Sequence, residues 1–261
     1  MINSKKFESF FSGLAGQFTG HIRKSIPNYE LAEKSTINAL SSIDFKNDSL
    51  LLDIGASEGT FAILLNSICE NRFKTHNLDP NNEMQSIFEK LNNSNSQNVF
   101  VKKAFGEGFG EFEGFYPIRA YDIIRESMTF QFISNDRQLQ YLTVSNALRD
   151  GGVFITQSKC FKMVAAEYLQ KEAEKDKYKA LSFTPEQMTR KKTSILEGME
   201  KNMVTDAETE LYLSNSFLGF YRYWDSCNFH GWIAYNDIIG QLRARNFLNN
   251  FNVHYNERKN K

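Results

Sequence analysis

The sequence of 261 residues predicts an α/β fold in which a mostly parallel sheet, covered by helices on both sides, ends in an antiparallel hairpin. Apolar runs alternate with amphipathic segments between residues 50 and 158, which is the pattern of repeated strand–helix–strand units. Runs such as 153–155 (Val-Phe-Ile) are continuously apolar, as strands buried on both faces require. Two later apolar runs, 220–223 and 231–235, are joined too closely for a parallel crossover and should pair antiparallel.

The elements of the predicted core follow one another in alternation. An amphipathic helix begins after Pro27 and closes near Ile43, just before the first apolar run. The following elements are strand 50–54, helix 59–70, strand 73–79, helix 82–92, strand 98–105, strand 121–126, helix 135–149 and strand 152–158.

The charged stretch after the core predicts a helical insert. Thr184 and Thr205 each begin a capping-box pattern, and Gly219 is expected to end the second of these helices in a left-handed conformation. The residues after Phe251 have little to bury and are expected to fray. We expect one domain over 1–261, made of N-terminal helices (1–48), a core (49–159), the insert (160–219), the hairpin (220–236) and a tail (237–261).

Composition and charge exclude several classes of protein. Hydrophobic residues make up 41% of the chain, and 15 glycines and 4 prolines are too few for a collagen-like or low-complexity sequence. Equal numbers of basic and acidic residues, 31 each, leave no net charge that would attract nucleic acid or an anionic membrane. The N-terminal segment has no apolar run long enough for a signal peptide or a membrane span, which predicts a cytoplasmic protein without membrane contact.

The cysteines and histidines predict neither a disulfide framework nor a metal site. The cysteines are far apart and include no Cys-x-x-Cys pair, and the histidines are isolated from one another. These residues are Cys69, Cys160, Cys227, His21, His76, His230 and His254.

A glycine-bearing turn between the first strand and the next helix is the main candidate for a ligand site. The segment 51–60 reads LLDIGASEGT, with Gly55 and Gly59 where a backbone can approach a nucleotide-like ligand closely. Asp79 ends the following strand, where a carboxylate can accept hydrogen bonds from both hydroxyls of a ribose. The dinucleotide fingerprint would require G-x-G-x-x-G, so the pattern favours S-adenosylmethionine (SAM) over NAD.

The same turn also matches the G-x-S-x-G nucleophile elbow of serine hydrolases. Ser57 would then be the nucleophile, with Asp225 and His230 completing the triad in the required order. This alternative leaves Asp79 without a role, and an HGGG-like oxyanion segment does not precede the elbow. In a third interpretation, the glycines only form a tight strand-to-helix turn, and Asp79 caps the following helix.

The motif resembles that of class I SAM-dependent methyltransferases, which have an acidic residue before a glycine-rich turn and a second acidic residue at the end of strand two. This resemblance implies a Rossmann-like fold and SAM as cofactor. It places Asp53 and the 55–59 loop near the methionine portion of the cofactor and Asp79 at its ribose.

A narrower resemblance is to the carboxy-SAM synthases of the tRNA wobble-uridine pathway. Several segments are similar to this family and occur in the same order, and together they extend over most of residues 20–236. They are 21–29 (HIRKSIPNY), 129–133 (TFQFI), the helix to Gly151-Gly152, 204–206 (VTD) and 226–229 (SCNF). The cofactor-site residues that the resemblance implies are Tyr29, Gly55, Ala56, Ser57, Asp79 and Pro80, with Ser127 where that family has an asparagine. The family resemblance also implies a homodimer.

Two departures from that family bear on activity. Phe105-Gly106-Glu107 stands where an acidic residue usually meets the adenine. Thr193 stands where the family has an arginine that holds the extra carboxylate, with Arg190, Lys191 and Lys192 nearby. A lysine lacks the planar fork that grips a carboxylate.

These observations predict a methyltransferase that uses SAM on a small-molecule or unidentified acceptor. Carboxy-SAM synthesis from SAM and prephenate is the alternative, and a cofactor-binding protein that has lost catalysis and acts through a partner is the second alternative. No catalytic residue is assigned.

Overall fold

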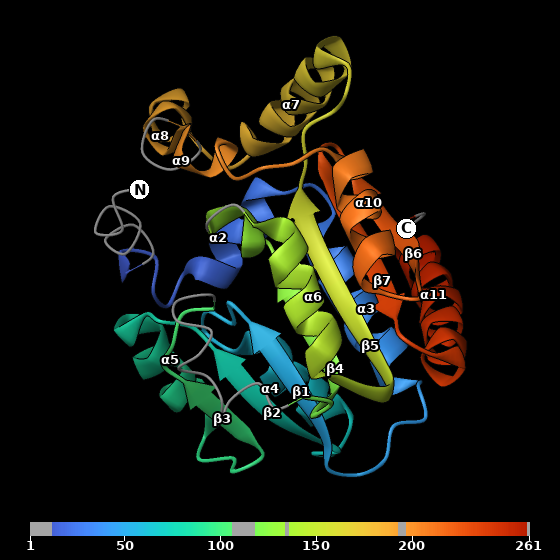
Figure 1. The fold of residues 1–261 in the computed structure, drawn as a ribbon. Coiled ribbons are helices and arrows are strands. Elements are labelled where there is room, and N and C mark those ends of the chain that lie inside the picture. The colour runs from blue at the N-terminus through green and yellow to red at the C-terminus, as the bar shows by residue number, and fades with distance from the viewer. Residues whose placement is uncertain (1–11, 106–117, 134–135, 193–196, 260–261) are drawn as a thin grey trace.

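The computed structural model describes residues 12–105, 118–133, 136–192 and 197–259. These residues form a seven-stranded sheet in the order β3-β2-β1-β4-β5-β7-β6 (Figure 1). The strands are β1 (Ser49–Ile54), β2 (Phe73–Leu78), β3 (Asn98–Val101), β4 (Tyr121–Ser127), β5 (Leu148–Lys159), β6 (Gly219–Ser226) and β7 (Phe229–Tyr235). β1 to β5 pair in parallel, whereas β7 pairs antiparallel with both β5 and β6. The predicted fold class is confirmed.

Apolar side chains on both faces of the strands hold the helices to the sheet. Leu51 and Ile123 belong to one core, whereas their neighbours Leu52 and Ile124 belong to the other. This is why the strands are continuously apolar in sequence. The helices of the first face include α3 (Tyr29–Ser41), α4 (Thr60–Ile68) and α11 (Ile238–Lys259), and those of the second include α6 (Arg137–Ala147) and α10 (Asp206–Ser216). Along the β3 side, α5 (Asn82–Asn92) packs against α4 and β3.

The insert divides into two parts. Helices α7 (Ala165–Lys179), α8 (Pro185–Lys191) and α9 (Glu197–Glu200) lie beyond the end of β5, above α2 (Phe18–Ser25) in Figure 1. Helix α10 instead packs against α6 and β6. Both predicted capping boxes are present, because the Thr184 and Thr205 side chains each accept a hydrogen bond from the backbone of the third helical residue.

Four expectations about the ends of elements are wrong. β5 begins at Leu148 and not at residue 152, so residues 148 and 149, predicted as the end of helix 135–149, belong to the strand. β3 stops at Val101 rather than at residue 105. Gly219 begins β6, and the helix before it ends at Ser216 without a left-handed glycine. The segment after Phe251 continues as helix to Lys259, and Tyr255 is buried in it.

The C-terminal helix is held by a row of aromatic rings. Phe247, Phe251 and Tyr255 recur every four residues and therefore share one face of α11. The Phe251 ring centroid lies 5.3 Å from that of Tyr255 and 4.8 Å from that of Tyr223. The spacing of these aromatic residues is a helical period that is visible in the sequence. The prediction that the residues after Phe251 fray overlooks this period.

Candidate functional site

The predicted site residues gather at the carboxyl ends of the parallel strands. The order of the sheet reverses between β1 and β4, which is the switch point where open α/β sheets bind ligands. The turn after β1 is fixed to its neighbour, because the Gly55 and Ala56 amides both donate to the Leu78 carbonyl, at 2.8 and 3.0 Å. The backbone of this turn thus lies beside the end of β2.

Both glycines of the turn have left-handed backbone conformations and close protein neighbours. Gly55 has φ +69°, and a Cβ there would lie 2.0 Å from Thr129 Oγ1. Gly59 has φ +67°, and a Cβ would lie 2.3 Å from the Phe88 ring. A side chain at either position would therefore collide with the protein as well as strain the backbone. The glycines are required by the packing of the turn itself.

Asp79 lies just past β2 and holds the glycine turn. One carboxylate oxygen accepts the Ser57 amide and the other accepts the Asn81 amide, each at 3.0 Å. Asp79 is half-buried. Burial raises the pKa of Asp79 to about 6, against the opposing effect of the two backbone hydrogen bonds. A carboxylate has about four acceptor positions, so two are left for a ligand.

Asp53 lies beneath the turn in a buried ion pair. Its carboxylate accepts a hydrogen bond from Arg125 at 2.7 Å, and both residues are buried. The Arg125 guanidinium also stacks 3.9 Å from the centre of the Phe61 ring. Burial raises the pKa of Asp53, although Arg125 acts in the opposite direction. Sequence reasoning missed Arg125, which stands directly beside Asp53 in the pairing of β1 with β4.

Tyr29, Ser127 and Gln157 form a hydrogen-bonded chain at the ends of β4 and β5. The Tyr29 hydroxyl lies 3.1 Å from Ser127 Oγ, which donates to Gln157 Oε1 at 2.8 Å. Burial raises the pKa of Tyr29 to about 12, so the phenol stays protonated at neutral pH. The structure brings Tyr29 and Ser127 together and adds Gln157, which the sequence analysis did not single out.

Two glutamates that the sequence analysis did not assign position the loops around this edge. Glu126 is fully buried and accepts the amides of Thr129 and Phe130, at 2.5 and 2.9 Å, which fixes the turn that faces Gly55. Glu58 accepts the Phe18 amide at 3.1 Å and the Thr19 hydroxyl at 2.9 Å. It thereby joins the glycine turn to the start of α2.

The remaining predicted site positions contribute in different ways. Ala56 is buried within the turn, and Pro80 is exposed immediately after Asp79. Residues 106 and 107, named as the departure at the adenine position, and Thr193 lie outside the described residues. Lys191 is described, and its Nζ donates to His21 Nε2 at 2.6 Å and to Ser25 Oγ at 2.9 Å.

The hydrolase triad does not assemble. Asp225 and His230 are hydrogen-bonded to each other, but Ser57 follows β1, whereas His230 lies on β7. Three strand intervals separate β1 from β7 in the sheet, which is about 14 Å at roughly 4.8 Å per interval. Ser57 is therefore out of reach of the histidine.

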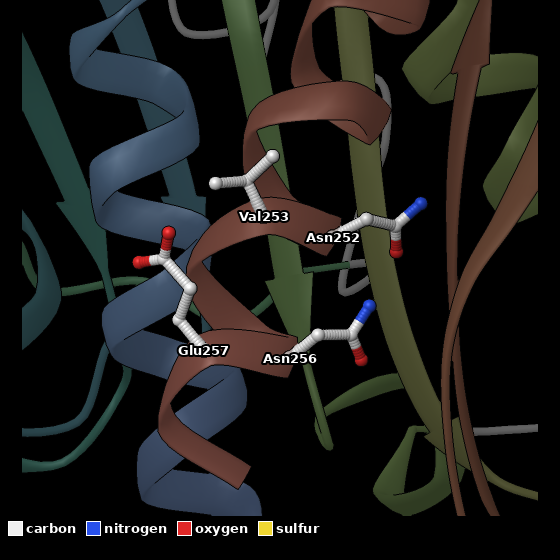
Figure 2. A pocket seen from close by; sticks show the side chains of 4 residues that line it. All are labelled: Asn252, Val253, Asn256 and Glu257. Carbon is white, nitrogen blue, oxygen red and sulfur yellow. The ribbon is translucent and has the colours of Figure 1, made fainter. Parts of the chain in front are cut away.

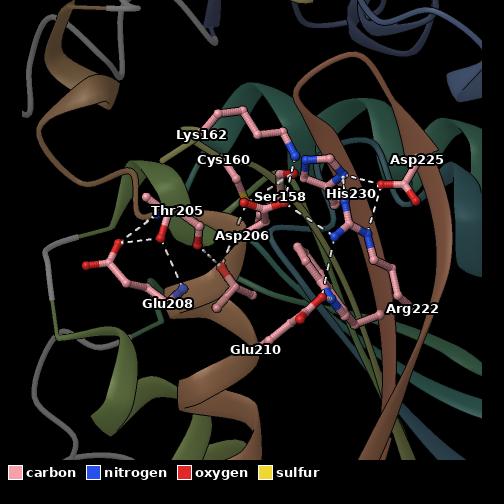
Figure 3. Close-up of polar contacts among 12 residues, drawn as sticks. Ser158, Cys160, Lys162, Thr205, Asp206, Glu208, Glu210, Arg222, Asp225 and His230 are labelled. Carbon is pink, nitrogen blue, oxygen red and sulfur yellow. Dashed lines mark hydrogen bonds and ion pairs between the residues drawn. The ribbon is translucent and has the colours of Figure 1, made fainter. Parts of the chain in front are cut away.

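Asp225 and His230 belong instead to a polar network that joins β6 and β7 to α10 (Figure 3). Arg222 Nε donates to Asp225 at 2.8 Å, and its guanidinium reaches Asp206 and Glu210 at 3.3 and 3.4 Å. Asp206 also accepts from Lys162 at 2.6 Å. Acidic and basic side chains form ion pairs with one another here, so the network has a structural role.

An open hollow lies on α11 alone. It is lined by Asn252, Val253, Asn256 and Glu257 (Figure 2). None of these residues belongs to the predicted site, and all four come from one helix.

In the described ranges, no three His, Cys, Asp or Glu side chains are arranged to hold a metal ion, and no helix has the length and apolar character to cross a membrane.

No protein-family model matches the chain, and no curated protein matches it in sequence. Solved structures do match. A SAM-dependent methyltransferase from Aquifex aeolicus superposes with a TM-score of 0.52 at 12% identity, covering 87% of this chain and 97% of that one.

Two further structures agree. A putative SAM-dependent methyltransferase from Methanococcus maripaludis gives a TM-score of 0.55 at 18% identity, covering 89% of this chain and 94% of that one. A complex between the Haloferax volcanii Trm112 methyltransferase activator and a putative methyltransferase gives 0.53 at 11% identity, covering 86% and 96%. The chain has the Rossmann-like fold of SAM-dependent methyltransferases. At these identities, the likeness establishes the fold alone.

Proposed function

We propose that this protein is a SAM-dependent methyltransferase that binds its cofactor across the carboxyl ends of β1, β2 and β4. The observation that carries the proposal is the geometry of Asp79, which holds the glycine turn through one hydrogen bond to each oxygen and keeps acceptor capacity for two hydroxyls. A ribose presents two neighbouring hydroxyls. The residues present therefore fit the sugar of SAM.

Each predicted residue has a place in this proposal. Asp79 binds the ribose, and the backbone of Gly55, Ala56 and Ser57 lines the turn beside it. Ser127, at the end of β4, and Tyr29, at the start of α3, face the methionine side. Asp53 supports the turn from beneath through Arg125, and Gly59 packs against Phe88. Pro80 follows Asp79 at the border of the proposed cofactor position.

Methyl transfer from SAM requires mainly that the cofactor and the acceptor are aligned. When bound, SAM supplies an electrophilic methyl group on a positively charged sulfonium. The chain's own groups orient the cofactor and exclude water from the reacting atoms, and alignment with desolvation can supply much of the rate enhancement. The protonated phenol of Tyr29 acts as a neutral hydrogen-bonding group in this arrangement.

The direct test is ligand binding by the purified chain. SAM or its demethylated product at about 100 times its dissociation constant should stabilise the fold by about 2.7 kcal/mol, a rise in melting temperature of roughly 5–10 °C. Mass spectrometry of any small molecule that copurifies gives an independent answer. A shift with NAD and none with either SAM ligand would refute the proposal.

Carboxy-SAM synthesis remains the second candidate because of the sequence resemblance. The nearest described residues to the family's arginine position are Lys192 and Lys191, and Lys191 donates hydrogen bonds to His21 and Ser25 of α2. Incubation with SAM and prephenate, followed by mass spectrometry, separates the candidates: a carboxylated cofactor would reverse our ranking. Binding of SAM without turnover on any acceptor would support the catalytically inactive partner protein.

A further inference from the structure

Residues 12–20 form a strap at the carboxyl ends of the parallel strands. At the start of this strap, the Ser12 hydroxyl accepts a hydrogen bond from Asn81 Nδ2 at 3.0 Å and donates one to Glu83 Oε2 at 2.9 Å. Asn81 is the N-cap of α5 and Glu83 lies in the first turn of that helix, which follows β2. The first anchor of the strap is therefore at the end of β2.

The second anchor is at the end of β1. The Thr19 hydroxyl donates to Glu58 Oε2 at 2.9 Å and lies 3.0 Å from Thr60 Oγ1, where the glycine turn leads into α4. The chain then passes through α2 to Tyr29, whose hydroxyl lies 3.1 Å from Ser127 Oγ at the end of β4 (Figure 1). This segment thus contacts the ends of β2, β1 and β4 in the order in which these strands lie in the sheet.

Both anchors adjoin the carboxylate that we assign to the ribose. Asp79 accepts hydrogen bonds from the amides of Ser57 and Asn81. Asn81 also binds the start of the strap, and Ser57 directly precedes Glu58, which binds its end. A ribose held by Asp79 would therefore lie beside both anchors, and the strap would border the route by which a cofactor reaches this carboxylate.

The strap is held less firmly than the chain that follows it. Among residues 12–20 no residue is buried, whereas Ser25, Ile26 and Tyr29 are exposed by only 4%, 5% and 4%. Between the anchors, Gly16 has φ +81°, a backbone conformation that glycine adopts without strain. Segments with few buried contacts open at low cost, because water replaces their hydrogen bonds. The strap can therefore detach while the buried chain after it stays in place.

We propose that the strap is a gate for the cofactor: it detaches from Glu58 and Asn81 when SAM enters or leaves, and it closes again afterwards. This inference rests on the proposed function, because it concerns access to the same site. The anchoring hydroxyls bond to the protein and not to the ligand, so closure is equally favourable in the free and the loaded protein. Such a gate slows entry and release by the same factor and leaves the affinity unchanged.

The test measures the rates of SAM binding together with the opening of the strap. Surface plasmon resonance gives the association and dissociation rate constants of SAM, and hydrogen exchange at the amides of residues 13–20, without SAM, reports opening. The anchor variant is Ser12→Ala with Thr19→Val, which removes one hydroxyl from each anchor and leaves the glycine turn unchanged. The matched control is Ser42→Ala with Ser86→Ala, which removes two exposed hydroxyls that bond to the backbone of α3 and α5.

We expect the anchor variant to bind and to release SAM about tenfold faster than the parent, with a dissociation constant changed by less than about threefold. The amides of residues 13–20 should also exchange faster in this variant, because its strap is open for a larger fraction of the time. The control should match the parent in every measurement.

Faster release without faster binding would show that the two hydroxyls only support the bound cofactor, and this result would overturn the gate. Unchanged hydrogen exchange, or unchanged SAM rates despite faster exchange, would overturn it as well. In each of these cases the parent still binds SAM, so the proposed function stands. Absence of SAM binding in the parent would refute the proposed function and the gate together.

Discussion

The two halves of the sheet edge at the carboxyl ends of the parallel strands are built in different ways. At the ends of β1 and β2, backbone amides and one carboxylate form the surroundings of the glycine turn, and Asp79 reaches it across a single strand interval. At the end of β5, Lys159 binds Glu172 of α7, which also binds Lys175, and Lys191 of α8 binds His21 of α2. The first half is specified by a short sequence motif, whereas the second depends on how distant segments pack.

Helix α2 joins the two halves. Its first turn is held by Glu58 of the glycine turn, and its last turn receives Lys191 through Ser25 and His21. Tyr178 of α7 also donates to the Arg23 carbonyl at 2.8 Å. A change in the position of α2 would therefore alter both the contacts of Glu58 at the glycine turn and the contacts of Lys191.

The largest expected effect lies beneath the cofactor half. Arg125→Met leaves the Asp53 carboxylate buried without its partner, which should lower the free energy of unfolding by about 3–5 kcal/mol. Urea denaturation measures this loss. The double variant Asp53→Asn with Arg125→Met should recover much of the stability, because no buried charge is left unpaired. If the double variant is no more stable than Arg125→Met, the ion pair is not the cause.

Asp79→Ala tests the cofactor half directly. Loss of charge-assisted hydrogen bonds to a ribose should weaken SAM binding by about 10–100-fold, corresponding to roughly 1.5–3 kcal/mol. Calorimetric titration measures the dissociation constant. Glu89→Ala, which removes an exposed carboxylate from α5, is the matched control and should bind as the parent does. Equal affinity in parent and Asp79→Ala would place the ligand elsewhere.

The contrast between the halves also separates what the sequence could predict from what it could not. The glycine turn and Asp79 are close in sequence to the strands that position them, so a local sequence pattern predicts that they lie at the ends of β1 and β2. Arg125 was missed because its partner Asp53 is 72 residues away and meets it only when β1 pairs with β4. The contacts of Lys159 with Glu172 of α7 and of Lys191 with His21 of α2 join distant segments and form only in the folded chain, so a local pattern does not predict them.

The pH dependence of cofactor binding should sharpen the assignment of Asp79. Its pKa is raised to about 6 by burial in the free protein, and hydroxyl donors of a ribose favour the ionised form. Affinity should therefore be full above pH 7 and fall as the pH drops through 6, to about one tenth at pH 5. Titrations at constant ionic strength measure the profile. Asp79→Asn should bind weakly and lose the inflection near pH 6; an unchanged inflection would assign it to another group.

The smallest expected effect concerns the chain of hydroxyls between the two halves. Tyr29→Phe removes the hydrogen bond to Ser127 Oγ but keeps the buried ring, and Ser127 still donates to Gln157. A neutral hydrogen bond contributes about 0.5–1.5 kcal/mol, so SAM affinity should fall by no more than about tenfold if the chain orients the methionine side. Calorimetry on Tyr29→Phe, Ser127→Ala and the double variant forms a double-mutant cycle. Additive losses would show that the two hydroxyls act independently, whereas a coupling of about 0.5 kcal/mol or more would show that they act as one group linking the cofactor half to β5.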